Sequence, residues 1–325
     1  MMTILPTSVF RPLANASMLP PEIKNLIPAG LRLLRVEPIT GSGSNRQYWR
    51  LIFEDAPELI ATLGSVREEN EAFIYLAELF AQRGINVPKP VAVSPDSMAY
   101  LQTSVGSRSL FECLECKDLI AKAMRLLADV HSVEGIDYSR CYPVAEMDRR
   151  SIMWDLNYFK YCFLKTCADI NIDEGALEDD FELLAADLLQ AEPKAFMVRD
   201  FQSRNVMISP DNEPYLIDFQ GGRLGPVYYD VASFLWQARA GFSSELRSEM
   251  ISVYCTAAGM DETEFRRVLP TFVIFRLLQV LGAYGFRGRF ERKEHFLASI
   301  PPALASLKAE ITPRYPYLYD LVVRL

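Results

Sequence analysis

The stretch 196–220 constrains the fold of this chain more than any other, because it predicts a β-hairpin with polar side chains at its open end. Its two apolar runs, Val206–Ile208 and Tyr215–Ile217, are separated by a dense cluster of turn-forming residues. Asn205 immediately precedes the first run, and Asp218 immediately follows the second. Because antiparallel strands lie about 4.8 Å apart, these two side chains are expected to be neighbours.

The side chains around this hairpin suit a divalent cation and a proton acceptor. Amide and carboxylate oxygens, as in Asn205 and Asp218, are ligands that Mg²⁺ accepts, and the ion leaves its other positions to water and phosphate. Asp200, just before the hairpin, is placed to accept the proton of an attacking hydroxyl. The D-x4-N-x12-D spacing therefore predicts phosphoryl transfer by a base, a metal-binding amide and a metal-binding carboxylate.

The length and charge of the chain exclude several classes of protein. With 325 residues, 50% of them hydrophobic, it can bury a large core and divide into two lobes. Its net charge of −8 argues against a nucleic-acid partner. Residues 1–30 contain no basic segment followed by an apolar one, and no run of about 18 uncharged apolar residues occurs. We therefore expect a cytoplasmic protein without a membrane partner.

The first third of the chain predicts a small antiparallel sheet with one helix. The expected strands are 31–40, 47–53, 58–64, 91–94 and 98–103, and the expected helix is 68–84. A Gly-Ser-Gly-Ser-Asn-Arg turn at 41–46 joins the first two strands. In protein kinases such a turn covers the nucleotide phosphates. For this segment alone, an ordinary hairpin turn is an equally good interpretation.

Residues 102–108, rich in Ser, Thr and Gly, predict a hinge, and the periodicity beyond them is helical almost to the end. The expected helices are 118–133, 151–167, 177–189, 227–240, 245–258, 262–284 and 302–311. Only the hairpin is expected to interrupt them. The two lobes are therefore expected at 1–103 and 104–325.

Taken together, these features resemble the aminoglycoside phosphotransferase / choline kinase family over nearly the whole chain. The signature of that family, H-x-D-x4-N followed by a hydrophobic-Asp-Phe/Trp segment, corresponds to Val198-Arg-Asp-Phe-Gln-Ser-Arg-Asn205 and Leu216-Ile-Asp-Phe-Gln220. The resemblance implies an α+β, protein-kinase-like two-lobed fold, with a small antiparallel-sheet N-lobe carrying one helix and a large, mostly helical C-lobe. It also implies ATP as donor, Asp200 as base, and Asn205 and Asp218 as Mg²⁺ ligands.

A narrower resemblance concerns the acceptor. The R-D-F-x-S-R-N and I-D-F-Q segments, with the passage 277–287, look most like the N-acetylmuramate/N-acetylglucosamine 1-kinases, which phosphorylate an anomeric hydroxyl in cell-wall sugar salvage. An amino sugar is therefore the preferred small-molecule acceptor. Two alternatives stay open: an aminoglycoside or choline-type kinase, whose pocket should collect carboxylates, and a nucleotide-binding pseudokinase or scaffold that has lost transfer.

The resemblance also implies contacts to both substrates. The residues expected at the nucleotide are Gly41, Ser42, Gly43, Ser44, Arg46, Thr62, Gln102, Thr103 and Ser104. The residues expected at the acceptor are Asp155, Asn157, Arg204 and Gln220.

The chain departs from the family pattern at two positions. Val198 stands where the signature has His, which removes a hydrogen-bonding side chain but neither the base nor a metal ligand. No lysine occurs between Lys24 and Lys89, so the residue that usually grips the α- and β-phosphates is missing, with Thr62 near its expected place. The candidates to replace it are the arginines at 46, 50 and 67, or the metal and the loop amides alone. An acidic partner for such an arginine is expected at Glu69 or Glu71.

Two more residues are expected to be structural. Asp230 lies at a predicted helix start, where it would cap exposed amides. His131 lies on a predicted helix and is expected to pack or to cap.

Overall fold

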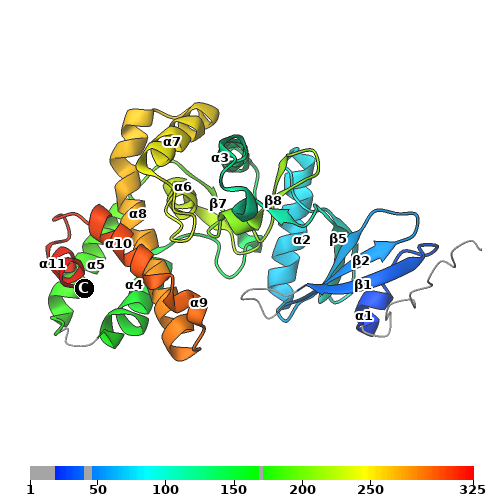
Figure 1. Cartoon of the computed structure of the whole chain (residues 1–325), viewed down its shortest axis with the longest axis horizontal. Helices are drawn as coiled ribbons and strands as arrows, with labels where there is room; N and C mark the ends of the chain where they lie inside the picture. The colour runs from blue at the N-terminus through cyan, green and yellow to red at the C-terminus, as the bar shows by residue number, and fades with distance from the viewer. Residues whose placement is uncertain (1–18, 40–45, 168–170) are drawn as a thin grey trace, which may run out of the picture. The chain divides into compact units, whose positions relative to one another are not determined.

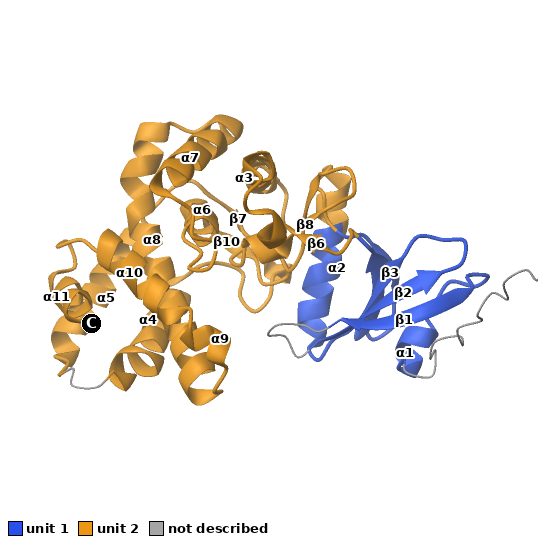
Figure 2. Ribbon diagram, viewed as in Figure 1, with its two compact units in different colours: residues 1–77, 88–104 blue, residues 78–87, 105–325 orange. Residues whose placement is uncertain are grey.

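Two units make up the computed structural model, which describes residues 19–39, 46–167 and 171–325 (Figure 1). Unit 1 takes in residues 1–77 and 88–104, and unit 2 takes in residues 78–87 and 105–325 (Figure 2). The first of the three divisions, between residues 77 and 78, falls inside the helix Arg67–Gln82.

Unit 1 contains a five-stranded antiparallel sheet in the order β1-β2-β3-β5-β4. Its elements are α1 (Pro21–Lys24), β1 (Leu33–Ile39), β2 (Gln47–Phe53), β3 (Leu59–Leu63), α2 (Arg67–Gln82), β4 (Pro90–Val93) and β5 (Ala99–Thr103). The predicted order of three strands, a helix and two strands is therefore the observed one. The short helix α1 was not expected, because four residues are too few for helical periodicity to show.

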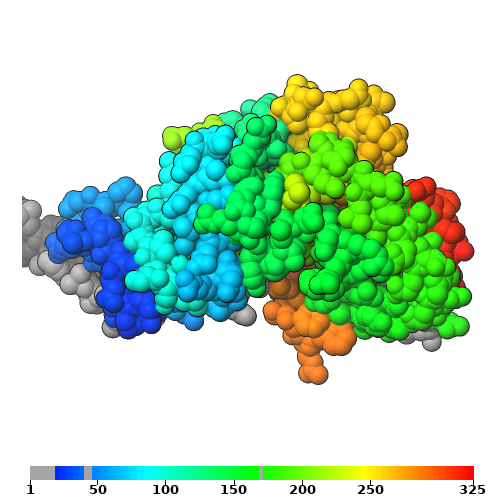
Figure 3. Space-filling view, turned by 180° about the vertical axis from the view of Figure 1, so that it is seen from behind, coloured from blue at the N-terminus to red at the C-terminus, as the bar shows by residue number. Residues whose placement is uncertain are grey.

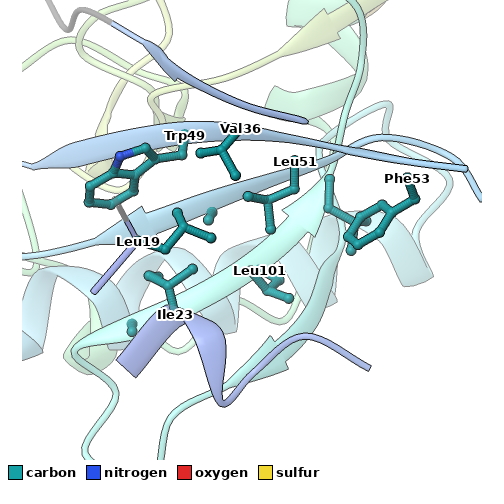
Figure 4. Packing of buried hydrophobic residues seen from close by; sticks show 10 residues of the cluster. Leu19, Ile23, Val36, Trp49, Leu51, Phe53 and Leu101 are labelled. Carbon is teal, nitrogen blue, oxygen red and sulfur yellow. The ribbon is translucent and has the colours of Figure 1, made fainter. Parts of the chain in front are cut away.

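The alternation of β2 decides which face of the sheet is buried. Trp49, Leu51 and Phe53 are buried, whereas the residues between them are partly exposed. Leu19 and Ile23, from the chain around α1, pack onto this face (Figure 4). Each large apolar side chain removed from water in this way contributes about 1.5–3 kcal/mol, so the cluster anchors α1 to the sheet.

Helix α2 carries the apolar face that its sequence predicts. Phe73, Leu76 and Ala77 are buried, and the ring of Phe73 stacks on Tyr100 of β5 with centroids 4.9 Å apart. The helix stops before Gly84, whose φ of +78° is a backbone conformation that glycine adopts without steric cost.

Unit 2 is mostly helical and holds two small sheets. Its helices are α3 (Lys117–His131), α4 (Arg149–Cys162), α5 (Glu174–Leu189), α6 (Tyr228–Leu235), α7 (Ser244–Ala258), α8 (Glu262–Gly285), α9 (Glu294–Leu297), α10 (Ile300–Glu310) and α11 (Pro316–Arg324). Its strands are β6 (Arg108–Ser109), β7 (Lys194–Met197), β8 (Val206–Ile208), β9 (Pro214–Leu216) and β10 (Arg223–Pro226). The predicted hairpin is present as β8 and β9, with Val206 opposite Leu216.

Three expectations for this unit were wrong. The helix expected at 151–167 ends at Cys162, and a short 3₁₀ turn, Leu164–Thr166, follows it. The hairpin is not alone among the helices, because β7 pairs with β10 and β6 extends the hairpin to a three-stranded sheet. The helix expected at 227–240 ends at Leu235. There the Gln237 amide nitrogen donates to the Phe234 carbonyl oxygen at 2.6 Å, which satisfies one of the carbonyls that a helix end leaves open.

Close packing of α8 on α4 sets the geometry of the site described below. A Cβ at Gly282 would lie 2.7 Å from the Phe159 nitrogen, and a Cβ at Gly285 would lie 2.2 Å from the Cys162 carbonyl oxygen. Only glycine therefore allows the two backbones to approach this closely. Within the described residues, the segment Glu262–Phe290 is also long and apolar enough to cross a membrane, but 67% of its most apolar window is buried inside the protein.

The C-terminal segment packs against α5, and its red atoms appear beside the green ones at the right-hand edge of Figure 3. Arg314 donates to the Asp187 carboxylate in two hydrogen bonds of 2.5 Å, and the Leu318 amide donates to Asp180 at 2.7 Å. The acidic side chains of α5 therefore hold the end of the chain in place.

Candidate active site

Strand β7 leads directly into the loop that carries Asp200. Val198 and Phe201 are buried on either side of Asp200, whose own side chain is 50% exposed. The Asp200 carboxylate lies 3.7 Å from the Arg276 guanidinium and accepts a 3.4 Å hydrogen bond from Gln202. The loop is thus held by its apolar residues while Asp200 stays accessible.

Asn205 joins the other two residues of the predicted array. Its amide nitrogen donates to the Asp200 carbonyl oxygen at 2.9 Å and to the Asp218 carboxylate at 3.3 Å. The hairpin register causes this proximity, because Asn205 precedes β8 and Asp218 lies just beyond β9. The structure therefore brings all three residues together.

The backbone of Asp218 is in the left-handed region, with a φ of +61°. Asp and Asn tolerate this conformation better than most residues. The Gln220 amide nitrogen donates to the Asp218 carboxylate at 2.9 Å, and Gln220 is itself buried. Gln220, expected at the acceptor, therefore orients Asp218.

The donor set at this end of the hairpin fits Mg²⁺. Within the described residues, the two hydrogen bonds of the Asn205 side chain use its nitrogen, which leaves its oxygen as the candidate metal ligand. Within the described residues no three His, Cys, Asp or Glu side chains gather to bind a metal. One carboxylate and one amide suit an ion that takes few protein ligands and completes its shell with phosphate oxygens and water.

The position of Asp230 corrects the expectation that it caps a helix. Its carboxylate accepts the backbone N–H groups of Val198 at 2.7 Å and Arg199 at 2.8 Å, and it makes no capping bond in α6. His131 is buried, as expected, and contacts both Asp230 at 3.1 Å and the Tyr254 hydroxyl at 2.7 Å. Asp230 therefore fixes the backbone before Asp200, including the unusual φ of +72° at Arg199.

A small cavity, partly open to solvent, lies in unit 2. Asp155 of α4, Arg199, Arg223 of β10 and Tyr229 of α6 line it. The Asp155 carboxylate accepts hydrogen bonds from one Arg199 nitrogen at 3.2 and 3.3 Å and from Gln279 of α8 at 2.8 Å. Burial raises the pKa of the Asp155 carboxyl, against the opposing effect of Arg199.

Arg276 connects this cavity to Asp200. Its guanidinium is buried, donates to the Tyr229 hydroxyl at 3.0 Å and to the Gln279 side-chain oxygen, and lies 3.7 Å from the Asp200 carboxylate. Tyr229 also donates to Gln279, and burial raises its pKa, so it is a neutral hydroxyl. Asp200 and the cavity are thus parts of one polar network.

The other expected acceptor residues lie apart from the cavity. Asn157 is two residues beyond Asp155 on α4, which turns it to a different face, and it does not line the cavity. Arg204 is exposed on the short 3₁₀ turn Ser203–Asn205 and makes no hydrogen bond or ion pair within the described residues. The structure brings neither side chain to Asp155.

Sequence reasoning missed five residues of this network: Arg199, Arg223, Tyr229, Arg276 and Gln279. Gln279 had a detectable signal, because it and Arg276 are polar residues one turn apart in the otherwise apolar stretch 272–281. Arg223 and Tyr229 had none, since only the β7–β10 pairing and the packing of α6 bring them to the cavity.

Unit 1 holds the residues expected at the nucleotide. Residues 41–44 lie outside the described residues. The buried guanidinium of Arg46 lies 3.3 Å from the Glu69 carboxylate of α2, whereas Arg50 faces Glu58 at 3.8 Å and Arg67 pairs with Glu71 on the exposed side of α2. Among the three arginines, only that at 46 therefore combines burial with a carboxylate on α2.

The remaining residues expected at the nucleotide lie on β3 and β5. Thr62 is fully buried in β3. The N–H groups of Thr103 and Ser104 donate to the carbonyl oxygens of Lys89 and Glu58, so contacts to adenine would have to use other backbone groups of this segment. Gln102 is part of β5, opposite Ile60 of β3.

Comparison with known proteins agrees with this geometry. The model of the family described as "Phosphotransferase enzyme family" matches residues 35–267. A relative from Neisseria meningitidis serogroup B, named N-acetylmuramate/N-acetylglucosamine kinase, is 26% identical over 85% of this chain and 87% of its own.

Solved structures share the fold at low sequence identity. A choline/ethanolamine kinase family protein from Mesorhizobium loti is 15% identical, with a TM-score of 0.60 over 89% of this chain and 92% of its own. An amicoumacin kinase solved with AMP-PNP and Ca²⁺ is 14% identical, with a TM-score of 0.62 over 85% of this chain and 90% of its own. The expected fold class is thereby confirmed.

Proposed function

The chain belongs to the phosphotransferase enzyme family, and we propose that it uses ATP and Mg²⁺ to phosphorylate the anomeric hydroxyl of an N-acetylated amino sugar. The observation that carries this proposal is that the Asn205 amide contacts both the Asp200 backbone carbonyl and the Asp218 carboxylate, while the Asp200 carboxylate is half exposed. That is the arrangement of base, metal amide and metal carboxylate that phosphoryl transfer needs.

Each residue of the array has a role in this proposal. Asp200 orients the acceptor hydroxyl and accepts its proton, while the Arg276 guanidinium holds the carboxylate in place. The Asn205 amide oxygen and the Asp218 carboxylate hold Mg²⁺. When bound, the ion would neutralise charge on the ATP phosphates. Rate acceleration would then come mainly from positioning and charge stabilisation.

The relatives support an amino sugar as acceptor, because the kinase from Neisseria meningitidis is named for two of them. A cationic acceptor, such as an aminoglycoside or choline, needs free carboxylates in its pocket. Among the described residues that line the cavity, Asp155 supplies the carboxylate, and it already accepts hydrogen bonds from Arg199 and Gln279. We therefore rank a cationic acceptor second. Separately, we propose that the enzyme acts in the cytoplasm, where ATP is available.

The nucleotide is proposed to use residues of unit 1, so that lobes 1–103 and 104–325 bind donor and acceptor respectively. Among the described residues, Arg46 is the candidate for the missing lysine, because its pair with Glu69 places a fixed positive charge between the sheet and α2. Residues 41–44 and the segment 102–104 are proposed to contact the phosphates and the adenine. Thr62 is fully buried and uncharged, so it is the weaker candidate for a phosphate contact.

Mg²⁺-dependent ATP consumption in the presence of candidate acceptors tests the function. We expect turnover with N-acetylmuramate or N-acetylglucosamine and none above background with choline or an aminoglycoside. The product should carry an acid-labile phosphate and no reducing end, as a sugar 1-phosphate does. ATP binding without transfer to any of these acceptors would instead support the pseudokinase alternative.

Replacing Arg46 by glutamine is expected to weaken ATP binding by roughly 10- to 100-fold, the usual loss for one charge-assisted contact to phosphate. Titration of a fluorescent ATP analogue without acceptor measures this directly. Glu69→Gln should weaken binding less, because it frees the guanidinium without removing it.

Arg32 provides a matched control for this pair. It lies in the same unit and pairs with Glu54 at 2.6 Å, but it is exposed. Arg32→Gln should leave the dissociation constant of the analogue unchanged. Equal affinity in Arg46→Gln and parent would show that the metal and the loop amides suffice for the phosphates.

A further inference from the structure

A buried guanidinium without an acidic partner lines the cavity next to Asp155. The Arg223 side chain is 2% exposed, and its hydrogen bonds, 3.1 and 3.4 Å long, both go to the Gly221 carbonyl oxygen. Throughout residues 19–39, 46–167 and 171–325, no carboxylate forms an ion pair with it. A buried charge without a counter-ion lowers the stability of the fold, so the presence of a buried arginine at this position needs a physical reason.

The other charges of the cavity compensate one another. Arg199 pairs with Asp155 at 3.2 Å, and Arg276 faces Asp200 at 3.7 Å. Arg223 is therefore the surplus positive charge. Burial, with added repulsion from Arg199, lowers the pKa of Arg223 to about 10, which still leaves the guanidinium protonated at neutral pH.

We propose, on the premise of the phosphotransfer described above, that this cavity binds a carboxylate of the acceptor and that Arg223 is its counter-ion. A planar guanidinium matches a carboxylate with two parallel hydrogen bonds. The cavity is small and partly open to solvent, so a carboxylate would approach Arg223 from its open side. Its link to Asp200 through Arg276 and Tyr229 places the carboxylate on the acceptor side of the site.

The two sugars in the name of the Neisseria meningitidis kinase differ by such a substituent. N-acetylmuramate is N-acetylglucosamine with an added lactyl ether that ends in a carboxylate. Both carry the same anomeric hydroxyl, so the reacting group is constant between them. The enzyme should therefore prefer the acidic sugar, and the preference should depend on Arg223.

The test compares kcat/KM for the two sugars in the parent and in Arg223→Met. We expect kcat/KM of the variant to fall about 100-fold with N-acetylmuramate, because one charged bidentate contact is lost, and less than about 3-fold with N-acetylglucosamine. Arg247→Met is the matched control. Its guanidinium is also largely buried, beside Trp236, and it pairs with Glu310 away from the cavity. This control should change neither value.

Isothermal calorimetry without nucleotide separates the subsite from the reaction. The parent should bind N-acetylmuramate more tightly than N-acetylglucosamine, and Arg223→Met should bind both alike. If the parent phosphorylates neither sugar but keeps this difference in binding, the proposed reaction fails and the carboxylate subsite stands. Equal binding of the two sugars by the parent overturns the subsite.

A second variant covers the case in which methionine destabilises the fold. Arg223→Lys keeps the positive charge but loses the paired geometry, so it should lose about 10-fold with the acidic sugar only. An equal loss with both sugars in either folded variant would assign Arg223 a structural role and overturn the proposal.

Discussion

Replacing Asp200 by asparagine is expected to lower kcat on the order of 10³-fold, within the range that general-base catalysis usually contributes. The amide has the shape of the carboxylate but cannot accept the hydroxyl proton. Little else should change, because the side chain is 50% exposed and the loop is held by Val198, Phe201 and the Asp200 carbonyl oxygen. Initial rates at saturating ATP and acceptor measure the effect.

Two controls make this result specific to the base. Asp211→Asn makes the same chemical change at an exposed position in the turn of the same hairpin, and it should keep the parent rate. Binding of an ATP analogue to Asp200→Asn should equal that of the parent. Parent-level turnover by this variant, with nucleotide binding intact, would refute the assignment of Asp200 as the base.

Elements with strong local signals were predictable from the sequence. The alternation of β2 located its bounds, and the apolar face and terminal glycine of α2 located that helix to within two residues. Elements that depend on partners far apart in the sequence were not predictable in this way. Each strand of the β7–β10 pair has only four residues, and they meet across the whole catalytic loop and hairpin. A four-residue run has no reliable period of its own.

The residues of the candidate site were likewise predictable only where a local pattern relates them. Asn205 and Asp218 flank one hairpin and Asp200 lies on the loop just before it, so spacing and turn chemistry sufficed to place them together. The cavity takes its residues from α4, the catalytic loop, β10, α6 and α8, and no sequence period relates these segments. Asp230 shows the same limit, because its position at a helix start suggested a cap, whereas the fold turned it toward the catalytic loop.

The ligand role assigned to Asp218 predicts a large and metal-dependent defect in Asp218→Asn. We expect the Mg²⁺ concentration for half-maximal rate to rise at least about 100-fold. Mutating a residue that only hydrogen-bonds to a metal ligand already lowers metal affinity by about 10- to 100-fold, and losing a ligand itself should cost at least as much. Asparagine is the right replacement, since it tolerates the φ of +61° and so leaves the backbone unchanged. Rates measured over a Mg²⁺ titration at fixed ATP give the value.

A graded series tests whether the metal itself is the cause. Gln220→Ala removes the amide that donates to the Asp218 carboxylate at 2.9 Å, so it should raise the Mg²⁺ requirement by only about 10-fold. Asp211→Asn, exposed in the same hairpin, should not raise it. If Asp218→Asn instead lowered kcat while its Mg²⁺ titration matched that of the parent, Asp218 would have to act on the substrates rather than on the ion. A common metal site formed with Asn205 would then be excluded.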